Sequence, residues 1–557
     1  MNKISRRHFI RKSAVGTGSL LFFSHLPRHS YGNTDDYVVA DTTYGKLRGE
    51  RVYGVNIFRG VPYAGYVSGE RRFRRPAPLK PWTGILNALR LGHPAIQAPN
   101  QTYGINEPEP AEDCLALNIW TPGNDNKRRP VMFYNHGGGF TTGSGGSVAQ
   151  DGANLARFFD VVVVQSNHRL GLMGYLYLDE IAGEEYKGSG NMGMLDIITA
   201  LQWVQHNIIY FGGDPHNVMV FGESGGGAKT SCLYAMSEAA PYFNKASIES
   251  GPGIMMTETE VANYTTRLVL RELNISPRKW TKLLEVPVND FLAIQLKLPE
   301  IALKEAAGNP EKLSKGIGAA GPGRFGPVVD GVLLKRHPFY PRAPEISRDK
   351  PLITGWNEDE YTFFAMVSGE KEAFKLDFQG LKSRLAIQYG EKTDEIIKAY
   401  REARPEASAS DIFVAISSFT RMGMGSIEIA EKKYAQKGAP VYLYNFGYKS
   451  EVKIPGTDYP LGTPHAMDIQ FKFFNLVDEN GNARDPGNSM GGTRPGRIQA
   501  SKNFAEFWTS FARTGRPEAE GQPQWPAYNI NDRPVMRIDS ECSIIYDRFR
   551  LERQYFM

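Results

Sequence analysis

The 557-residue sequence contains only three cysteines, Cys114, Cys232 and Cys542, which allow at most one disulfide within the chain. None belongs to a C-x-x-C pair, and no group of histidines and cysteines has the spacing of a metal site. A chain of this length buries a core large enough to be stable without cross-links. We therefore predict no metal and no cofactor, and we leave open whether two of the cysteines pair.

Long apolar runs and a strong net charge are also missing. No stretch of about 18 or more apolar residues is present, so we predict no integral membrane span. The formal charge of +5 comes from the first thirty residues, which hold six basic residues and no acid; the remaining chain carries about −1. A nearly neutral body predicts no nucleic-acid partner.

The basic leader has a pattern of its own. Arg6 and Arg7 precede a modest apolar run from Ala14 to Phe23, which resembles a bacterial twin-arginine export signal. This predicts a signal peptide over residues 1–35 and a periplasmic or secreted protein. The alternative is a disordered basic tail. No clear small-x-small cleavage site marks the start of the mature chain.

Short apolar runs that look like buried strands alternate with helical patterns along the rest of the chain. Such alternation predicts one α/β domain over 36–557, built on a mainly parallel central sheet flanked by helices. A hairpin is expected around Tyr44-Gly45, and a helix over Leu195–Ile208. Strands are expected within Pro130–Phe140, Val161–Arg169, Asn217–Ser224, Pro351–Trp356 and Val441–Tyr448.

One of these strands runs into the pattern G-x-S-x-G, with Ser224 at its centre and a plausible helix after it. A serine at a sharp strand-to-helix turn has strained backbone angles, and glycines two residues before and after relieve the crowding. The serine hydroxyl is then exposed at the carboxyl edge of the sheet. The alternatives are a glycine-rich turn with an incidental serine, or a phosphate-binding loop. For the latter, Lys229-Thr230 stands at the wrong spacing.

A nucleophilic serine needs a base and an acid that orients the base. Only His337 and His465 follow Ser224, and we favour His465 because it lies in a turn-rich loop beyond a late strand. The acid is expected after an earlier strand, where Glu358, Asp359 and Glu360 stand side by side. The residue pattern does not choose among these three acids.

A glycine run supplies the remaining requirement of acyl transfer, backbone donors for a tetrahedral oxyanion. Gly137, Gly138 and Gly139 follow a strand directly, and adjacent glycines let two amides point the same way. The alternative is a merely flexible loop. Glycine loop, serine turn and late histidine in this order predict a serine acyl-transfer enzyme.

Four motifs resemble those of type B carboxylesterases, the cholinesterase-like branch of the α/β-hydrolase superfamily. They are "AEDCLALNIWTP", "FGESGGG", the continuous stretch from "NMGMLDIITALQ" through that serine motif, and "FWTSFARTGRPEAEGQPQWPAYN" near the end. The similarity extends from about Tyr37 to the end of the chain. It implies an α/β-hydrolase fold with helical cap-like insertions.

The resemblance also implies roles for particular residues. Ser224 would be the nucleophile, His465 the base and Glu360 the acid, with an oxyanion hole formed by the amides of Gly138, Gly139 and Gly225. Glu223 would steady the histidine. Two structural ion pairs are implied as well, Arg72–Glu112 and Arg169–Asp196.

Four departures from the family pattern limit this comparison. Gly225 stands where alanine is usual, which should loosen the turn slightly but keep the amide. Cys114 matches a disulfide cysteine whose partner is absent, so that bridge cannot form. The region before Cys114 lacks the choline-site tryptophan, which argues against acetylcholine as substrate. His168 replaces a tyrosine, and we expect it in the core or behind the site.

The predicted activity is hydrolysis of small-molecule carboxylic esters through an acyl-enzyme, with activity falling below about pH 6 as the histidine protonates. The same residues would serve on amides, carbamates or thioesters, and a non-catalytic binding protein is a further alternative. We expect the stretch from Gly253 to Gly326 to form a cap. Its Lys315 and Arg324 could bind an acidic ester, but we favour a solvated face. The natural substrate and the oligomeric state are left open.

Overall fold

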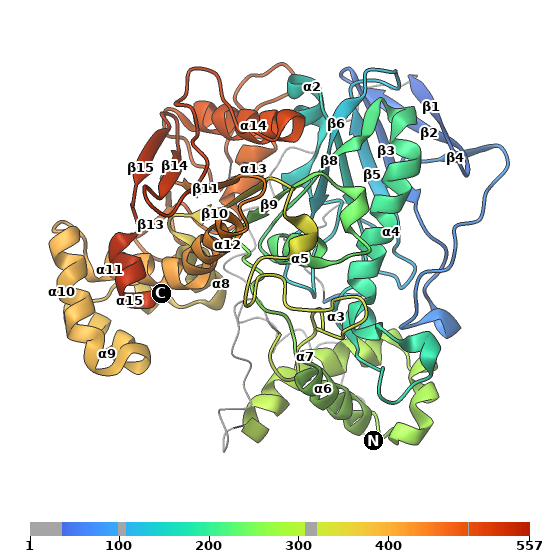
Figure 1. Cartoon of the computed structure of the whole chain (residues 1–557), viewed down its shortest axis with the longest axis horizontal. Helices are drawn as coiled ribbons and strands as arrows, with labels where there is room; N and C mark the ends of the chain where they lie inside the picture. Colours follow the sequence, from blue (N-terminus) through green and yellow to red (C-terminus); the bar gives the residue numbers. More distant parts are fainter. Residues whose placement is uncertain (1–35, 99–106, 307–319, 488) are drawn as a thin grey trace.

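The computed structural model describes residues 36–98, 107–306, 320–487 and 489–557, so the predicted leader and Lys315 lie outside the described residues. A 13-stranded sheet runs through the molecule (Figure 1). Its strands are β1 (Tyr37–Thr42), β2 (Gly45–Val52), β3 (Val55–Pro62), β4 (Ile85–Asn87), β5 (Ala116–Thr121), β6 (Arg129–Asn135), β7 (Val162–Ser166), β8 (Gly213–Glu223), β9 (Lys245–Glu249), β10 (Leu352–Asn357), β11 (Val441–Phe446), β14 (Pro534–Ile538) and β15 (Ser543–Tyr546). Two short strands, β12 (Ser450–Lys453) and β13 (Pro460–Gly462), pair separately.

The sheet is mostly parallel at its centre and antiparallel at its edges. Its order is β1-β2-β3-β5-β7-β6-β8-β9-β10-β11-β14-β15, with β4 beside β2. Every pair from β7 to β14 is parallel. The predicted hairpin forms between β1 and β2, where Thr42 pairs with Gly45. The predicted architecture, an α/β fold on a mainly parallel central sheet flanked by helices, is confirmed.

Helices cover both faces of this sheet. They are α2 (Ala153–Phe159), α3 (Gly171–Tyr175), α4 (Met192–Asn207), α5 (Gly225–Ala235), α6 (Thr259–Glu272), α7 (Val288–Ala306), α8 (Glu360–Ser368), α9 (Phe378–Tyr389), α10 (Thr393–Ala403), α11 (Ala409–Ser418), α12 (Met424–Ala435), α13 (Met467–Lys472), α14 (Arg497–Thr514) and α15 (Arg550–Phe556). Side chains of α4, α5 and α12 pack in one core cluster, and those of α2, α13 and α14 in a second.

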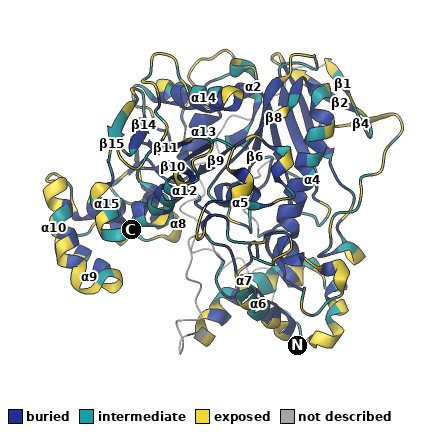
Figure 2. Cartoon of the chain, in the orientation of Figure 1, coloured by how far each residue is buried: buried dark blue, intermediate teal, exposed yellow. Residues whose placement is uncertain are grey.

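The continuous apolar runs of the central strands follow from this two-sided burial. Along β8, Val218 and Val220 belong to one cluster, whereas Met219 and Phe221 belong to the other. Successive side chains of a strand point to opposite faces, so a strand covered on both sides has no polar face. In Figure 2 the central strands are accordingly dark blue over most of their length.

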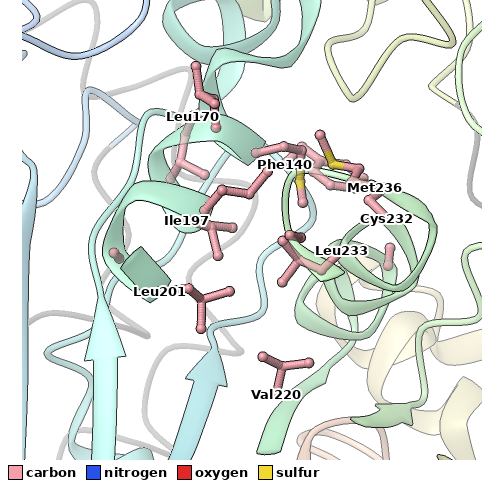
Figure 3. Close-up of a cluster of buried hydrophobic side chains, with 14 of the residues drawn as sticks. Phe140, Leu170, Ile197, Leu201, Val220, Cys232, Leu233 and Met236 are labelled. Atoms are coloured by element: carbon pink, nitrogen blue, oxygen red, sulfur yellow. The ribbon is translucent and has the colours of Figure 1, made fainter. Parts of the chain in front are cut away.

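One part of the core lies directly behind the glycine run that follows β6. Figure 3 shows Ile197 and Leu201 of α4, Val220 of β8 and Leu233 of α5 gathered with Phe140. Phe140 is only 9% exposed, although it immediately follows Gly139. The core therefore anchors the far end of the glycine run.

Two groups of helices are inserted into the strand–helix order. The first, α6 and α7 with the 3-10 helix η8 (Pro277–Leu284), lies between β9 and β10 and extends below the sheet in Figure 1. The second, α9 to α11, lies between α8 and β11, and Figure 2 shows the exposed outer surfaces of α9 and α10. The first insertion contains the segment expected to form a cap.

The two ion pairs implied by the family resemblance are both present. Arg72 Nε donates to Glu112 Oε2 at 2.6 Å, and Arg169 Nη2 donates to Asp196 Oδ1 at 2.7 Å. Both partners of the Arg169 pair are fully buried. All three cysteines are buried free thiols, which resolves the question of their pairing.

Candidate active site

The turn between β8 and α5 holds Ser224 in a strained conformation with φ 59° and ψ −122°. Such angles are uncommon for a residue with a side chain and are tolerated only where the surroundings impose them. A Cβ at Gly226 would lie 1.9 Å from the carbonyl oxygen of Asn135, and one at Gly222 would lie 2.5 Å from the backbone of Gly226. The glycines on both sides of Ser224 are therefore required by close backbone contacts.

His465 reaches this serine from the other end of the chain. Its Nε2 lies 2.8 Å from Ser224 Oγ, a hydrogen bond in which the hydroxyl donates once the imidazole is neutral. The loop that carries His465 joins β13 to α13, and Asn357 holds it by donating to the carbonyl of Pro464 at 2.8 Å. His337, the other histidine considered, instead contacts Glu258 at 2.8 Å.

Of the three adjacent acids, the structure brings only Glu360 to the histidine. Its Oε2 lies 2.5 Å from His465 Nδ1, and its Oε1 accepts from the amide of Asn357 at 2.8 Å. Asp359 contacts Lys449 at 2.5 Å, and Glu358 accepts from Arg548 at 2.8 Å. Glu360 is the first residue of α8 and is fully buried, whereas its two neighbours point to other partners.

A second buried carboxyl, Glu223, also contacts the imidazole. Its Oε1 lies 3.3 Å from His465 Nδ1. Burial raises the pKa of Glu223 well above its usual range, and the positive charge of a protonated His465 counteracts this shift. For His465, burial would lower the pKa, but the charges of Glu223 and Glu360 outweigh burial and raise it to about 9.

The glycine run after β6 lies beside the serine. Gly138 and Gly139 have φ values of 85° and 63°, which glycine adopts without strain. Within the described part of the chain, neither amide donates a hydrogen bond to protein. The amide of Gly225 lies at the first position of α5, where a helix leaves N–H groups unpaired and partially positive.

The absence of a side chain at Gly225 has a structural reason. A Cβ at this position would lie 2.4 Å from the nitrogen of Gly139 and 2.3 Å from its carbonyl oxygen. The alanine that is usual in the family would therefore displace the glycine run in this protein. Gly225 permits a close contact and does not merely loosen the turn.

We expect the Gly225→Ala variant to lose about 10- to 100-fold in kcat/KM because the methyl group pushes Gly139 away from the serine. Steady-state kinetics on a p-nitrophenyl ester measure this loss. Gly183→Ala is a matched control, because Gly183 has an ordinary φ of −73° and nothing within 4 Å of an added Cβ. Full activity of Gly225→Ala would contradict the close contact.

A buried cluster of basic side chains supports the glycine run from behind. Lys229 Nζ donates to the carbonyl of His136 at 2.9 Å, and burial lowers the pKa of Lys229 to about 7. The ring of His136 stacks on that of His168 at 4.5 Å between centroids. His168 thus lies behind the site, as expected, and Lys229 contacts the backbone of the glycine run instead of belonging to a phosphate-binding loop.

A cavity of about 600 Å³ opens above Ser224. Its lining includes Gly139 and Gly225, and the cap helix α7 contributes Gln295, Leu296 and Pro299. Ser224, Gly139 and Gly225 thus line one and the same cavity.

Sequence reasoning missed one side chain at this cavity and left two interpretations open for another. Arg421 lines the cavity, but it lies in the one-turn π-helix η13 (Phe419–Gly423), for which no motif gives a signal. Arg324, interpreted from sequence as part of a solvated face, lines the same cavity and is exposed there. Lys315, with which it was grouped, lies outside the described residues.

The described ranges lack two further features, a cluster of metal-ligating side chains and a membrane-spanning helix. Among these residues, no group of three or more histidine, cysteine, aspartate or glutamate side chains is arranged to hold a metal ion. No helix of the described chain is long and apolar enough to cross a membrane.

A strained serine at the carboxyl edge of a parallel sheet, bonded to a late histidine, is the arrangement of an α/β-hydrolase. The model of the carboxylesterase family matches residues 36–556. The para-nitrobenzyl esterase of Bacillus subtilis (strain 168) is 33% identical over 524 residues, covering 93% of this chain and 98% of that protein. Liver carboxylesterase 1F of Rattus norvegicus is 30% identical over 531 residues, covering 90% of each.

A solved structure agrees with these relatives. The carboxylesterase EST55 of Geobacillus stearothermophilus has a TM-score of 0.75 and 34% identity, covering 93% of this chain and 100% of that one. The chain belongs to the carboxylesterase family. It is a carboxylic ester hydrolase of the serine type.

Proposed function

We propose that this protein hydrolyses carboxylic esters through an acyl-enzyme, with Ser224 as nucleophile, His465 as base and Glu360 as the acid that orients the base. The observation that carries the proposal is the continuous chain of hydrogen bonds from Ser224 Oγ to His465 Nε2 at 2.8 Å and from His465 Nδ1 to Glu360 Oε2 at 2.5 Å. This geometry lets one imidazole both accept and return a proton.

In the first step, His465 Nε2 takes the hydroxyl proton of Ser224 as Oγ attacks the ester carbonyl. The resulting imidazolium is stabilised by the buried carboxylate of Glu360. It then protonates the departing alcohol as the bond between the carbonyl carbon and the alkoxy oxygen breaks. Water attacks the acyl-enzyme with the same histidine as base, releasing the acid and restoring Ser224.

The oxyanion of each tetrahedral intermediate would accept hydrogen bonds from the amides of Gly138, Gly139 and Gly225. These amides have no protein partner among the described residues, and that of Gly225 lies at a helix N-terminus. Donors that are already oriented need not reorganise when the charge develops. Phe140, buried in the core behind them, supports their position.

Amides, carbamates and thioesters remain alternative substrates for the same residues, because the catalytic chain acts on any activated acyl carbonyl. A non-catalytic binding role is disfavoured by the strain at Ser224 and by the intact chain of hydrogen bonds. Strained serine backbones persist where they serve function.

The experiment that tests this proposal is hydrolysis of p-nitrophenyl esters, from acetate to dodecanoate, by the mature protein. Turnover that is abolished by a serine-directed phosphonate supports the proposal, and the chain-length profile measures the acyl pocket. A folded protein that turns over no ester and takes up no phosphonate would overturn it.

We expect kcat/KM to rise with pH along a limb whose midpoint lies above 6.5, because the base must be neutral and the nearby carboxylates raise the pKa of His465. A higher pKa means that a higher pH is needed to remove the proton. The sequence predicted that activity falls below about pH 6. With the raised pKa of His465, we expect activity to fall already at a higher pH. A pH profile of kcat/KM between pH 5 and 10 measures the midpoint.

Glu223→Gln tests the cause of this shift. Removing one negative charge 3.3 Å from Nδ1 should lower the midpoint by roughly one pH unit. The isosteric amide keeps the packing, so a change in the midpoint reports charge. An unchanged midpoint would show that Glu223 stays protonated and does not act through its charge.

We also propose that the protein is exported through its twin-arginine leader and acts as a single domain over residues 36–557. The support is the Arg6-Arg7 pair before an apolar run, and the family match that begins at residue 36. Its substrate would then be met outside the cytoplasm.

A further inference from the structure

Among the described residues that line the cavity over Ser224, all charged side chains have the same sign. Two of these lining residues, Arg324 and Arg421, are positively charged at neutral pH, and none is acidic. Neither guanidinium forms an ion pair within the described chain, and both residues are exposed. The rest of the lining is mainly apolar, including Phe140, Phe325 and Leu296. The cavity therefore presents positive charge on an apolar wall.

Arg421 is held in place beside the histidine. Its guanidinium carbon lies 4.4 Å from the centroid of the Phe364 ring, and that ring lies 4.6 Å from the ring of His465. A guanidinium stacked on an aromatic face is immobilised, while the N–H groups at its edge stay free to donate. Phe364 belongs to α8, the helix that begins with Glu360.

The backbone at Arg421 is also unusual. The π-helix η13 interrupts the otherwise α-helical segment from α11 to α12. Single π-turns within α-helices occur frequently at functional sites, because the extra residue changes the direction of side chains. Here the altered turn contains both Arg421 and Met422, and both line the cavity.

Arg324 reaches the cavity from a different part of the fold. It follows Gly323, whose amide donates to Thr265 Oγ1 of α6 at 3.1 Å, so this short segment is tied to the cap. Its neighbour Phe325 is only 5% exposed and belongs to the main core. The backbone on both sides of Arg324 is thus anchored, which directs its side chain to the cavity.

We infer that the cavity accepts esters that carry a second, ionised acidic group, a carboxylate, which Arg324 and Arg421 bind while the scissile carbonyl lies over Ser224. This inference rests on the proposed function. Guanidinium groups bind carboxylates through paired N–H donors, and the apolar wall suits the hydrocarbon between the two substrate groups. Half-esters of dicarboxylic acids are the simplest members of this class.

Monoethyl adipate and ethyl hexanoate test the inference as a matched pair. They differ only in the far end of the acyl chain, which is a carboxylate in the first and a methyl group in the second. We expect the wild-type protein to show a kcat/KM at least about tenfold higher for monoethyl adipate at pH 8, measured as ethanol release. An exposed ion pair changes binding by up to about fivefold, so the two arginines together suffice for this preference.

The variants Arg324→Gln and Arg421→Gln test whether the two arginines cause the preference for monoethyl adipate. Each substitution should reduce the ratio of the two kcat/KM values by about three- to tenfold, and the double variant should abolish the preference. Arg267→Gln is a control on α6, because Arg267 is exposed in the same cap and does not line the cavity. This control should keep the wild-type ratio.

Salt provides an independent readout. Raising NaCl from 0.01 M to 0.5 M should reduce kcat/KM for monoethyl adipate several-fold more than for ethyl hexanoate, because salt screens exposed charges. Equal rates on the two esters, or a preference that survives the double substitution, would overturn the inference. If the inference fails in this way, serine-dependent turnover of ethyl hexanoate would still support the proposed function. If the protein hydrolyses no ester at all, both the inference and the proposed function are wrong.

Discussion

Replacing Ser224 by alanine should lower kcat/KM for esters by about 10⁴-fold or more, the largest effect of any single substitution in this protein. The methyl group cannot attack the carbonyl, and the histidine loses the hydroxyl that donates to it at 2.8 Å. The variant should remain folded, because the cost of φ 59° is imposed by the surrounding backbone and alanine is no larger than serine. Initial rates on p-nitrophenyl butyrate measure the loss.

Ser231→Ala provides the control for this experiment. Ser231 lies on the same helix, α5, and its hydroxyl donates to the carbonyl of Gly227 at 3.0 Å. We expect its loss of activity to be at least 100-fold smaller than that of Ser224→Ala. A serine-directed phosphonate should label the wild type and Ser231→Ala but not Ser224→Ala. Labelling of Ser224→Ala would assign the nucleophile to another residue.

Replacing Glu360 by glutamine should lower kcat/KM by about 10³- to 10⁴-fold, the second large effect. The amide carries no charge to stabilise the imidazolium, and its NH₂ group favours the histidine tautomer with the proton on Nε2, which cannot act as base toward Ser224. The substitution changes the hydrogen bond of 2.5 Å between Glu360 Oε2 and His465 Nδ1. Kinetics at several pH values distinguish this loss from a simple shift of the pH profile.

Glu358→Gln is the matched control, because the two glutamates are two positions apart and only one contacts the histidine. Glu358 contacts Lys449, Arg537 and Arg548, so its replacement leaves three cations near one another. We expect a lower Tm with kcat/KM within about tenfold of the wild type. An equal loss of activity in a folded Glu358→Gln variant would contradict the assignment of Glu360.

The serine turn and the glycine run were predictable from sequence because their requirements are local. A Cβ at Gly226 would overlap the carbonyl of Asn135, so the glycine pattern around Ser224 records a backbone constraint. The order of nucleophile and base was also predictable, because the topology of the fold places a late loop at the same sheet edge. His465 followed from this order.

The acid was predictable only through family resemblance. Glu358, Asp359 and Glu360 are consecutive, and their side chains diverge where β10 ends and α8 begins. Which of them faces the histidine depends on the exact turn between strand and helix, and no periodicity encodes that turn. The structure resolves it through the contacts of each carboxyl.

Sequence alone predicted the class of protein and singled out Ser224, His465 and the glycine run, because local sterics and chain order specify them. Only the tertiary structure decided the charge of the cavity, which Arg324 and Arg421 line from segments far apart in the chain. It also decided the contact of Lys229 with the carbonyl of His136 and the raised pKa of His465. These features depend on distances between residues far apart in the chain, and distance sets both desolvation and Coulomb energy.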